Sequence, residues 1–452
     1  MISLFLSKVI KTNKGNYLYD AVHNKIIAIP DEVLVEIEKG NFSTKYNNFI
    51  KKNNCRDFSK PINFNIEYSA YNIDELTWLI RNKFDAITLS VTENCNLRCE
   101  YCAYMPKYLT PMYKLKNMSL EIAFKAIDLL MKNSKQSNKL TLAFYGGEPF
   151  LRFDFIQKCI EYCKEKYPFK IPEYCVTTNG LLLSNDEIID FVIKNGFLVS
   201  VSLDGPEKIH NEHRVNAFNL PSFKEVWEGL NKLYKRDPSW FKNHVNISSV
   251  QTPCNICEEQ YEFLDDLWKN DVLLADVFVT EHFKEILNSK TKASIPKSSI
   301  SKYTRFGEKS FLSTLKSYHN SIKTEVNTNS IFPGGCCVPG IGRNFITSDG
   351  KIILCERVDE DIEYFTIGDV WNGINVDKIN ALINEFMQKA KKCKSCWASR
   401  LSNICFKDMF NLNNEQCKIC SERVYSNLKY YLENIKNDKE YITCLENISV
   451  QQ

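Results

Sequence analysis

The chain has 452 residues, of which 44% are hydrophobic, 25% charged and 12% aromatic. This composition excludes an intrinsically disordered chain, and the length suffices for two or three domains of about 150 residues each. No run of about 18 apolar residues occurs, so we expect no membrane span. The 58 Lys and Arg residues nearly balance the 55 Asp and Glu residues, so nucleic acid is not expected as an obligate partner.

Cysteine is frequent and unevenly placed along the chain. The 18 cysteines are too sparse for a small disulfide scaffold. The N-terminus resembles no secretory signal, so we expect a reducing cytoplasm, where clustered thiols more often bind metal or perform redox chemistry. Three cysteines lie within residues 95–102 and eight lie between residues 336 and 420. These two clusters are the candidate functional regions.

Residues 1–70 are expected to form a small N-terminal α+β domain. An Asn-Lys-Gly-Asn turn signal joins two strand-like runs, a third run follows, and Pro30 then opens an amphipathic helix that ends at Gly40. The Asn- and Lys-rich residues 41–60 are interpreted as a linker. The three predicted strands are Ile2–Ile10, Tyr17–Tyr19 and Lys25–Ile29.

From residue 84 to residue 285, strand-like runs alternate with helical stretches. The predicted strands are Ile87–Val91, Leu140–Tyr145, Tyr174–Thr177, Leu198–Leu203, Val245–Val250 and Val277–Thr280; the helices are Leu120–Lys132, Phe153–Glu165, Asp186–Lys194, Phe223–Tyr234 and Glu258–Trp268. This alternation predicts an α/β fold with a parallel sheet, a partial (β/α)6 TIM-like barrel, whose chemistry gathers at the carboxyl ends of the strands. A connector at 286–330, a cysteine-rich domain at 331–425 and a C-terminal helix and tail at 426–452 are expected to follow.

The first cysteine cluster directly follows the first predicted barrel strand. Cys95, Cys99 and Cys102 have the spacing Cys-x3-Cys-x2-Cys on one loop. Three such thiolates can ligate three corners of a 4Fe–4S cluster and leave the fourth iron open to a chelating substrate. A zinc site would need a fourth ligand, and no further Cys or His lies close in the sequence.

This spacing, with Tyr101 before the third cysteine, resembles the radical S-adenosylmethionine (SAM) superfamily. Gly146-Gly147-Glu148-Pro149 is similar to the motif that holds the methionyl amino group in that family. The resemblance implies that Arg214 pairs with the cofactor carboxylate. It also implies cofactor contacts from polar residues at later strand ends, namely Thr178, Asn179, Ser202 and Asp204. The implied chemistry is reductive cleavage of SAM to a 5′-deoxyadenosyl radical, with electrons from a donor such as flavodoxin or ferredoxin.

The second cysteine region allows two interpretations. Cys393-x2-Cys396 and Cys417-x2-Cys420 could form a tetrathiolate zinc site, although four cysteines would then remain unexplained. The region also resembles the SPASM extension, which binds two auxiliary clusters and would bring the total to three 4Fe–4S clusters. That resemblance assigns Cys336 or Cys337, Cys355 and Cys405 to one auxiliary cluster, and Cys393, Cys396, Cys417 and Cys420 to the other. Ser402 departs from the pattern, since a cysteine belongs there.

Three short motifs, Cys-Val-Pro-Gly, Cys-Glu-Arg-Val and Cys-Trp-Ala, resemble maturases of cysteine-rich ribosomal peptides, in particular sactipeptide and ranthipeptide synthases. The implied partner is a ribosomally synthesised Cys-rich precursor peptide, which receives a thioether cross-link. The N-terminal hairpin and helix suit leader-peptide capture by strand addition, or form a plain cap. Glu356 is a candidate catalytic base for the thiol proton, or it simply pairs with Arg357.

Two other functions are considered. Anaerobic sulfatase maturation to formylglycine uses the same radical chemistry, but in those enzymes an Asp directly follows the Gly-x4-Cys cysteine. Glu356 stands at that position here, which disfavours this function. A non-catalytic zinc or iron–sulfur protein is disfavoured by the Gly-Gly-Glu-Pro motif and the three-cysteine loop on a β–α barrel.

Overall fold

The computed structural model describes residues 6–61, 72–109, 114–251, 338–402 and 413–434, together with 263, 273–274, 278–279 and 406. The chain divides into two compact units. Unit 1 comprises residues 1–71, 311–336 and 381–452, and unit 2 comprises residues 72–310 and 337–380. No helix in the described parts of the chain has both the length and the apolar character needed to cross a membrane.

Unit 2 is built on a parallel sheet, which confirms the predicted α/β barrel fold. Its parallel strands are β4 (Ala86–Thr92), β5 (Thr141–Gly146), β6 (Glu173–Thr178), β7 (Leu198–Ser202), β8 (Val245–Ser248) and β10 (Leu273–Leu274). They lie side by side in chain order. The predicted sixth strand contains β11 (Phe278–Val279), which instead pairs with β9 (Val250–Gln251) in a separate two-stranded sheet.

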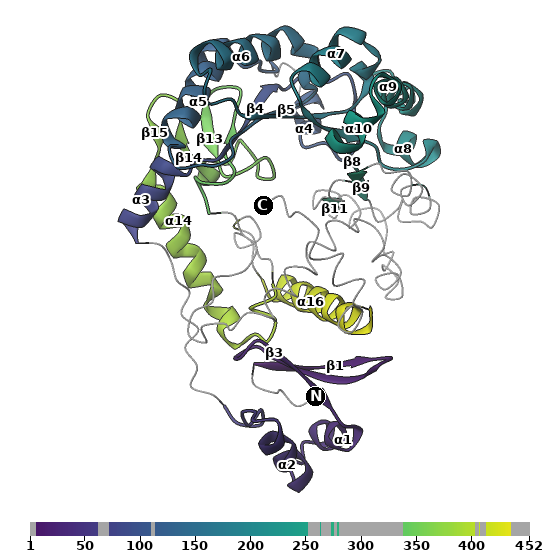
Figure 1. The fold of residues 1–452 in the computed structure, drawn as a ribbon, viewed down its shortest axis with the longest axis vertical. Coiled ribbons are helices and arrows are strands. Elements are labelled where there is room, and N and C mark those ends of the chain that lie inside the picture. The colour runs from purple at the N-terminus through teal and green to yellow at the C-terminus, as the bar shows by residue number, and fades with distance from the viewer. Residues whose placement is uncertain are drawn as a thin grey trace. The chain divides into compact units, whose positions relative to one another are not determined.

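The crossover helices form where apolar periodicity meets a capping side chain. The Ser119 hydroxyl accepts a hydrogen bond from the Ile122 amide, and Asn72 and Asn185 cap two other helices in the same way. The helices α5, α6, α7 and α9 lie along the outer side of the strands (Figure 1). The unit 2 helices are α3 (Ile73–Asn82), α4 (Met105–Leu109), α5 (Leu120–Asn133), α6 (Phe153–Lys166), α7 (Asp186–Lys194), α8 (Glu207–His213), α9 (Phe223–Arg236) and α10 (Pro238–His244). The predicted helix Glu258–Trp268 falls outside the described residues, except for residue 263.

A segment from the C-terminal half extends the same sheet. Strand β12 (Phe345–Ile346) pairs in parallel with β4, with Phe345 opposite Thr88. It continues antiparallel into β13 (Lys351–Ile353), β14 (Thr366–Asp369) and β15 (Gly373–Ile374), after which α14 (Val376–Lys389) begins. Residues 345–374, which lie in the predicted cysteine-rich region, therefore contribute strands to the sheet of the barrel.

Unit 1 contains an antiparallel sheet of β1 (Ser7–Thr12), β2 (Gly15–Asp20) and β3 (Lys25–Ile29). The helices α1 (Asp31–Lys39) and α2 (Thr44–Lys52) follow it, and α16 (Asn414–Asn434) comes from the C-terminal part. The interpretation of residues 41–60 as a linker is wrong, because α2 forms within this stretch and packs into the core of the unit. Helix α2 forms because Tyr46 and Phe49, one turn apart, are buried against α1 and the sheet.

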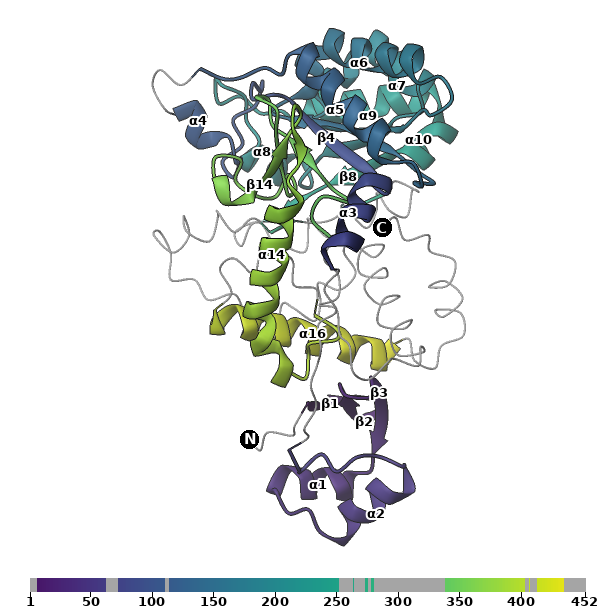
Figure 2. The same ribbon diagram turned by 90° about the vertical axis from the view of Figure 1, so that its left-hand side faces the viewer.

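Both faces of the small sheet are covered by apolar side chains. On one face, Leu18 and Ile29 pack against residues of α1 and α2. On the other face, Ile10, Tyr17 and Tyr19 share a buried cluster with Val424, Leu428, Tyr431 and Leu432 of α16. Figures 1 and 2 both show α16 alongside these strands. The N-terminal sheet is therefore the centre of a three-layer structure closed by the C-terminal helix.

Candidate active site

The three cysteines of the first motif lie on the loop between β4 and α4, at the carboxyl end of the barrel sheet. The loop is fixed by backbone hydrogen bonds, from the Arg98 amide to the Val215 carbonyl (2.6 Å) and from the Glu100 amide to the His213 carbonyl (3.1 Å). Cys99 is buried, and the other two thiols pack around the same small apolar cluster. The fold therefore holds the three thiols together on one ordered loop.

Each thiol accepts a hydrogen bond from the surrounding protein. The Cys95 sulfur accepts from the Leu97 amide (3.3 Å) and from Asn179 Nδ2 (3.6 Å). The Tyr104 amide lies 3.4 Å from the Cys102 sulfur, and Arg214 Nη1 lies 3.8 Å from that of Cys99. Donors to cluster sulfur ligands are a principal means by which proteins set the reduction potential.

The chemistry of these thiols fits an iron–sulfur cluster. Burial, assisted by the charge of Glu148, raises the pKa of Cys95 to about 11. Burial raises the pKa of Cys99 to about 12, although the Arg214 charge opposes it. Across the described parts of the chain, no three His, Cys, Asp or Glu side chains converge on a single metal ion. The charge of Cys102 raises the pKa of both other thiols, so the three are near neighbours; in a cubane each thiolate would bind a different iron and give up its proton on binding.

The two glycines after β5 bring this strand end against the segment before Cys95. The Gly147 amide donates to the Thr92 carbonyl (2.7 Å), and the Glu148 amide donates to the Asn94 carbonyl (2.9 Å). A Cβ atom on Gly147 would lie 2.2 Å from the Asn94 carbonyl oxygen, and Gly146 has φ +128°. Only glycine allows this approach and this conformation. The motif thus couples Glu148 rigidly to the cysteine loop.

Glu148 is a fully buried carboxylate with capacity for one more donor. Its Oε1 accepts from the Phe150 amide (3.0 Å) and the Thr178 hydroxyl (2.9 Å), and its Oε2 accepts from the Asn179 amide (2.8 Å). Burial raises the pKa of Glu148 to about 7, although these hydrogen bonds lower it. A carboxylate can accept about four hydrogen bonds. No described Lys, Arg or His forms an ion pair with it, so the site suits the ammonium group of a bound ligand.

The residues predicted for the later strand ends contact one another. The Tyr101 hydroxyl donates to Asp204 Oδ2, and Arg214 Nε donates to the same oxygen at 2.9 Å. The Val250 amide donates to Asp204 Oδ1 (2.9 Å), and the Arg214 guanidinium lies 5.2 Å from the centre of the Tyr101 ring. Asp204 and Arg214, which we expected to contact the cofactor, therefore form a buried ion pair beside the cysteine loop. Ser202 is the last residue of β7, and its side chain is partly buried.

In unit 2, Cys355 follows β13, and Glu356 lies next to it. Glu356 forms ion pairs with Arg343 (3.3 Å) and Arg357 (3.8 Å), the second of which is the pairing considered from the sequence. Cys336, Cys337 and Cys405 lie outside the described residues. The ligand set of the first auxiliary cluster therefore stays a prediction.

The other four cysteines of the second region lie in unit 1. Cys417 and Cys420 are in the first turns of α16, while Cys393 and Cys396 follow α14. Burial raises the pKa of Cys396, and the charges of Cys420 and Cys417 raise it further, so these thiols are near neighbours. Cys393 and Cys420 both pack on the cluster of Phe386 and Ala390. The structure thus brings together the four cysteines that were assigned to one site.

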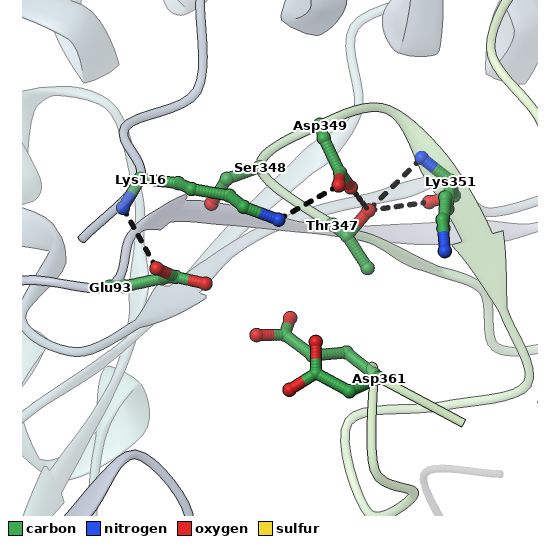
Figure 3. A pocket seen from close by; sticks show the side chains of 8 residues that line it. Glu93, Lys116, Thr347, Ser348, Asp349, Lys351 and Asp361 are labelled. Carbon is green, nitrogen blue, oxygen red and sulfur yellow. Dashed lines mark hydrogen bonds and ion pairs between the residues drawn. The ribbon is translucent and has the colours of Figure 1, made fainter. Parts of the chain in front are cut away.

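A polar pocket of about 90 Å³ beside the cysteine loop escaped the sequence analysis (Figure 3). It is lined by Glu93, Lys116, Thr347, Ser348, Asp349, Lys351, Glu360 and Asp361. The available signal was Glu93, a charged residue between a buried strand and the first cysteine. Its partners are remote in sequence, so their convergence could not be predicted.

Comparison with known proteins identifies the domain that holds the cysteine loop. Residues 89–247 match the radical SAM superfamily. The chain carries a radical SAM domain. This domain implies SAM and a 4Fe–4S cluster as cofactors.

Two sulfatase-maturating enzymes are among the relatives. The serine-type enzyme of Bacteroides thetaiotaomicron is 38% identical over 150 residues, which cover 32% of this chain and 35% of that protein. The cysteine-type enzyme of Clostridium novyi is 26% identical over 324 residues, which cover 68% of this chain and 83% of that protein. The chain thus matches about a third of the first relative's length.

The radical SAM chain also resembles a solved structure, that of native anSMEcpe with bound AdoMet and the Cp18Cys peptide. The TM-score is 0.58, the sequence identity is 19%, and the match covers 80% of this chain and 99% of that one. At this identity the likeness concerns the fold. It covers more of the chain than residues 89–247.

Proposed function

We propose that this radical SAM enzyme modifies a ribosomally made, Cys-rich peptide by joining a cysteine sulfur to a carbon atom. One observation carries the radical part of the proposal. Three thiols, one buried and two partly buried, lie on one loop, and the buried carboxylate of Glu148 is fixed to that loop through two backbone hydrogen bonds of its motif. A cluster and an amino-acid cofactor could therefore be held side by side.

In this proposal, Cys95, Cys99 and Cys102 hold the cluster, and Glu148 accepts the methionyl ammonium group of SAM. Asn179 donates to the Cys95 sulfur while its backbone amide donates to Glu148, so it positions both binding groups. When bound, SAM and the cluster supply the radical that abstracts a substrate hydrogen. The Asp204–Arg214 pair keeps a guanidinium beside Cys99, where it favours the thiolate.

The peptide part of the proposal rests on the second cysteine region and the N-terminal sheet. The eight cysteines of that region would supply the ligands of two auxiliary clusters, and a flavodoxin or ferredoxin would deliver electrons. After the radical has taken the hydrogen atom, bond formation must still release the thiol proton and one electron. Glu356, the carboxylate next to a candidate ligand, would take the proton, and an auxiliary cluster would take the electron. Among the described strands, none pairs with the outer edge of β3, so this edge is the candidate site for strand addition by a leader peptide.

Formylglycine formation on a sulfatase is the second candidate, and the similarity to two sulfatase-maturating enzymes favours it. The residue after Cys355 separates the two candidates, since Glu356 stands where an Asp is expected and is paired with two arginines. Mass spectrometry distinguishes the products. A thioether removes two hydrogen atoms and leaves sulfur in the peptide, whereas conversion of cysteine to formylglycine removes the sulfur.

The first experiment replaces Cys95, Cys99 and Cys102 together by Ala. The variant should form no 5′-deoxyadenosine from SAM and dithionite, because nothing would hold the cluster. Its iron content should fall by about four atoms per chain from that of the reconstituted wild type. The control Cys55→Ala removes one thiol from unit 1 and should keep both iron and activity. Cofactor cleavage by the triple variant would refute the assigned site.

The second experiment offers the wild type two peptides. One is the product of a short Cys-rich reading frame beside the gene, and the other is the Cp18Cys peptide named for the solved relative. Loss of two hydrogens from the first supports thioether formation, and loss of sulfur from the second supports sulfatase maturation. If neither peptide changed while SAM was cleaved, the proposed substrate class would be wrong.

A further inference from the structure

Lys107 lies in a buried ion cluster beside the cysteine loop. Its side chain is 11% exposed, and its ammonium contacts Glu93 Oε1 at 2.9 Å, Glu360 Oε1, and Asp361 Oδ2 at 3.5 Å. The carboxylates of Glu93 and Glu360 are 2% and 14% exposed, whereas that of Asp361 is 64% exposed. Two of the three contacts are thus largely shielded from water, where an ion pair has most influence on geometry.

Glu93 ties this cluster to the start of the cysteine loop. It lies two residues before Cys95, and the Lys116 amide donates to its Oε2 at 2.8 Å (Figure 3). The Glu93 amide donates to the Lys116 carbonyl (2.9 Å), and the Tyr108 hydroxyl donates to the Glu93 carbonyl (2.7 Å). Because Lys107 follows Cys102 by five residues, the Glu93–Lys107 pair closes the loop around the three cysteines.

Glu360 ties the same ammonium to a segment remote in sequence. It lies five residues after Cys355, and 253 residues separate it from Lys107. The turn at residues 347–351 borders the same pocket, where Lys116 pairs with Asp349 at 3.0 Å, but those two side chains are 44% and 43% exposed. Lys107 is therefore the buried link between the cysteine loop and the segment that follows Cys355.

We propose that Lys107 is a positioning residue, whose contact with Glu360 fixes the separation between the cysteine loop and the Cys355 segment. The inference deepens the proposed function and rests on it. In the proposed function the Cys355 segment would position the peptide relative to the cysteine loop, and a displacement of about 1 Å can lower a reaction rate about 100-fold. Loosening this contact should leave cofactor cleavage intact but lower the amount of peptide modified for each cofactor molecule cleaved.

The decisive variant is Glu360→Gln, which keeps the shape of the side chain and the Glu93–Lys107 pair. With dithionite and no peptide, 5′-deoxyadenosine should form within about twofold of the wild-type rate. With the Cys-rich peptide, the ratio of modified peptide to 5′-deoxyadenosine should fall about 10- to 100-fold. The electron paramagnetic resonance spectrum of the reduced cluster with SAM should be unchanged. Amide hydrogen exchange over residues 354–361 should become faster.

Asp361→Asn is the matched control, because Asp361 contacts the same ammonium from an exposed position. It should leave the product ratio and the exchange unchanged. Should Glu360→Gln fold poorly, Glu360→Asp shortens the side chain by one methylene, withdraws the carboxylate from Lys107 and should give the same lowered ratio.

An unchanged product ratio and unchanged exchange in Glu360→Gln would overturn the inference. Loss of cofactor cleavage would also overturn it, because Glu360 would then act on the cysteine loop itself. If the wild type failed to modify the peptide, the proposed function would fail separately. The exchange measurement would then still decide whether Glu360 holds the segment.

Discussion

At Gly147 the end of β5 passes so close to the cysteine loop that a side chain does not fit. Replacement by Ala would place a Cβ atom 2.2 Å from the Asn94 carbonyl oxygen, and this neighbour is backbone that cannot rotate away. We expect Gly147→Ala to destabilise the apo protein by about 1–3 kcal/mol and to displace the segment before Cys95. Urea unfolding and the iron content after reconstitution measure the two effects.

Gly342→Ala is the control for this prediction. Gly342 has open space around its Cα and no positive φ, so the substitution should leave iron binding intact. If Gly147→Ala bound as much iron as Gly342→Ala, the close approach of the two segments would be dispensable for the site.

Glu148 gives the folded apo protein a definite pH dependence. Burial raises its pKa from an ordinary value of 4.5 to about 7, so the folded state binds a proton that the unfolded state has released between these values. The contribution of Glu148 to the free energy of unfolding is therefore greatest below about pH 4.5 and falls as pH rises to about 7. The expected fall is about 3 kcal/mol.

Glu148→Gln removes this titration, although it also loses a hydrogen bond. The difference in free energy of unfolding between wild type and variant should therefore shrink as pH rises from about 4.5 to about 7. Urea unfolding of both proteins across this range provides the measurement. A difference that stayed constant with pH would mean that the carboxylate is ionised throughout.

The residue scale also shows where sequence reasoning stops. The resemblance to the radical SAM family predicted cofactor contacts from Tyr101, Asp204 and Arg214. The hydrogen bonds among these residues could not be predicted from the sequence, because Tyr101 and Asp204 lie 103 residues apart. A guanidinium pairs equally well with a cofactor carboxylate or an aspartate, and only the spatial neighbourhood decides between them.

Among the elements, the N-terminal sheet and α16 depend on each other. Deletion of residues 1–61 would expose the apolar face of α16 and remove the Tyr19 ring that packs edge-on against Trp397 at 6.3 Å. Trp397 follows Cys396, and Arg400 Nη2 donates to the Val22 carbonyl (3.0 Å). We therefore expect the truncated protein to lose iron from the site of the four unit 1 cysteines, about four of twelve atoms if each site holds a cubane.

Iron analysis of the truncated protein after reconstitution tests this expectation. Full iron content would show that the four cysteines need no support from the sheet. A loss of peptide modification after truncation would therefore not by itself show that the segment recognises a leader peptide. Substitutions at the outer edge of β3 are the cleaner test of that role.

Local signals predicted the elements whose apolar periodicity and caps agree. The prediction for α7 matches its bounds, Asp186–Lys194, and that for β3 matches Lys25–Ile29. Helix α2 was missed because only two of its nine side chains are buried and its composition is that of a loop. Strand β12 was missed because two residues give no periodicity and its partner β4 lies more than 250 residues earlier.

For the whole molecule, the sequence predicted the class of fold but not how distant segments combine. Unit 2 completes its sheet with residues from the C-terminal half, and unit 1 joins the first 71 residues to the last 72. Such pairings are set by complementary apolar surfaces, for which a single sequence carries no local mark. The structure of the described residues is therefore most informative about segments that are far apart in the sequence but adjacent in space.

The layered arrangement of unit 1 has a consequence for biosynthesis. The β1–β2 surface that carries Ile10, Tyr17 and Tyr19 leaves the ribosome long before its cover, since Arg400 lies 378 residues after its partner Val22. At about 5–20 residues per second, roughly 20–75 s pass before Arg400 is synthesised, and α16 follows later still. During that time an apolar sheet face is open to aggregation, so a nascent chain should engage a chaperone at its first strands and release it only after α16 has been synthesised.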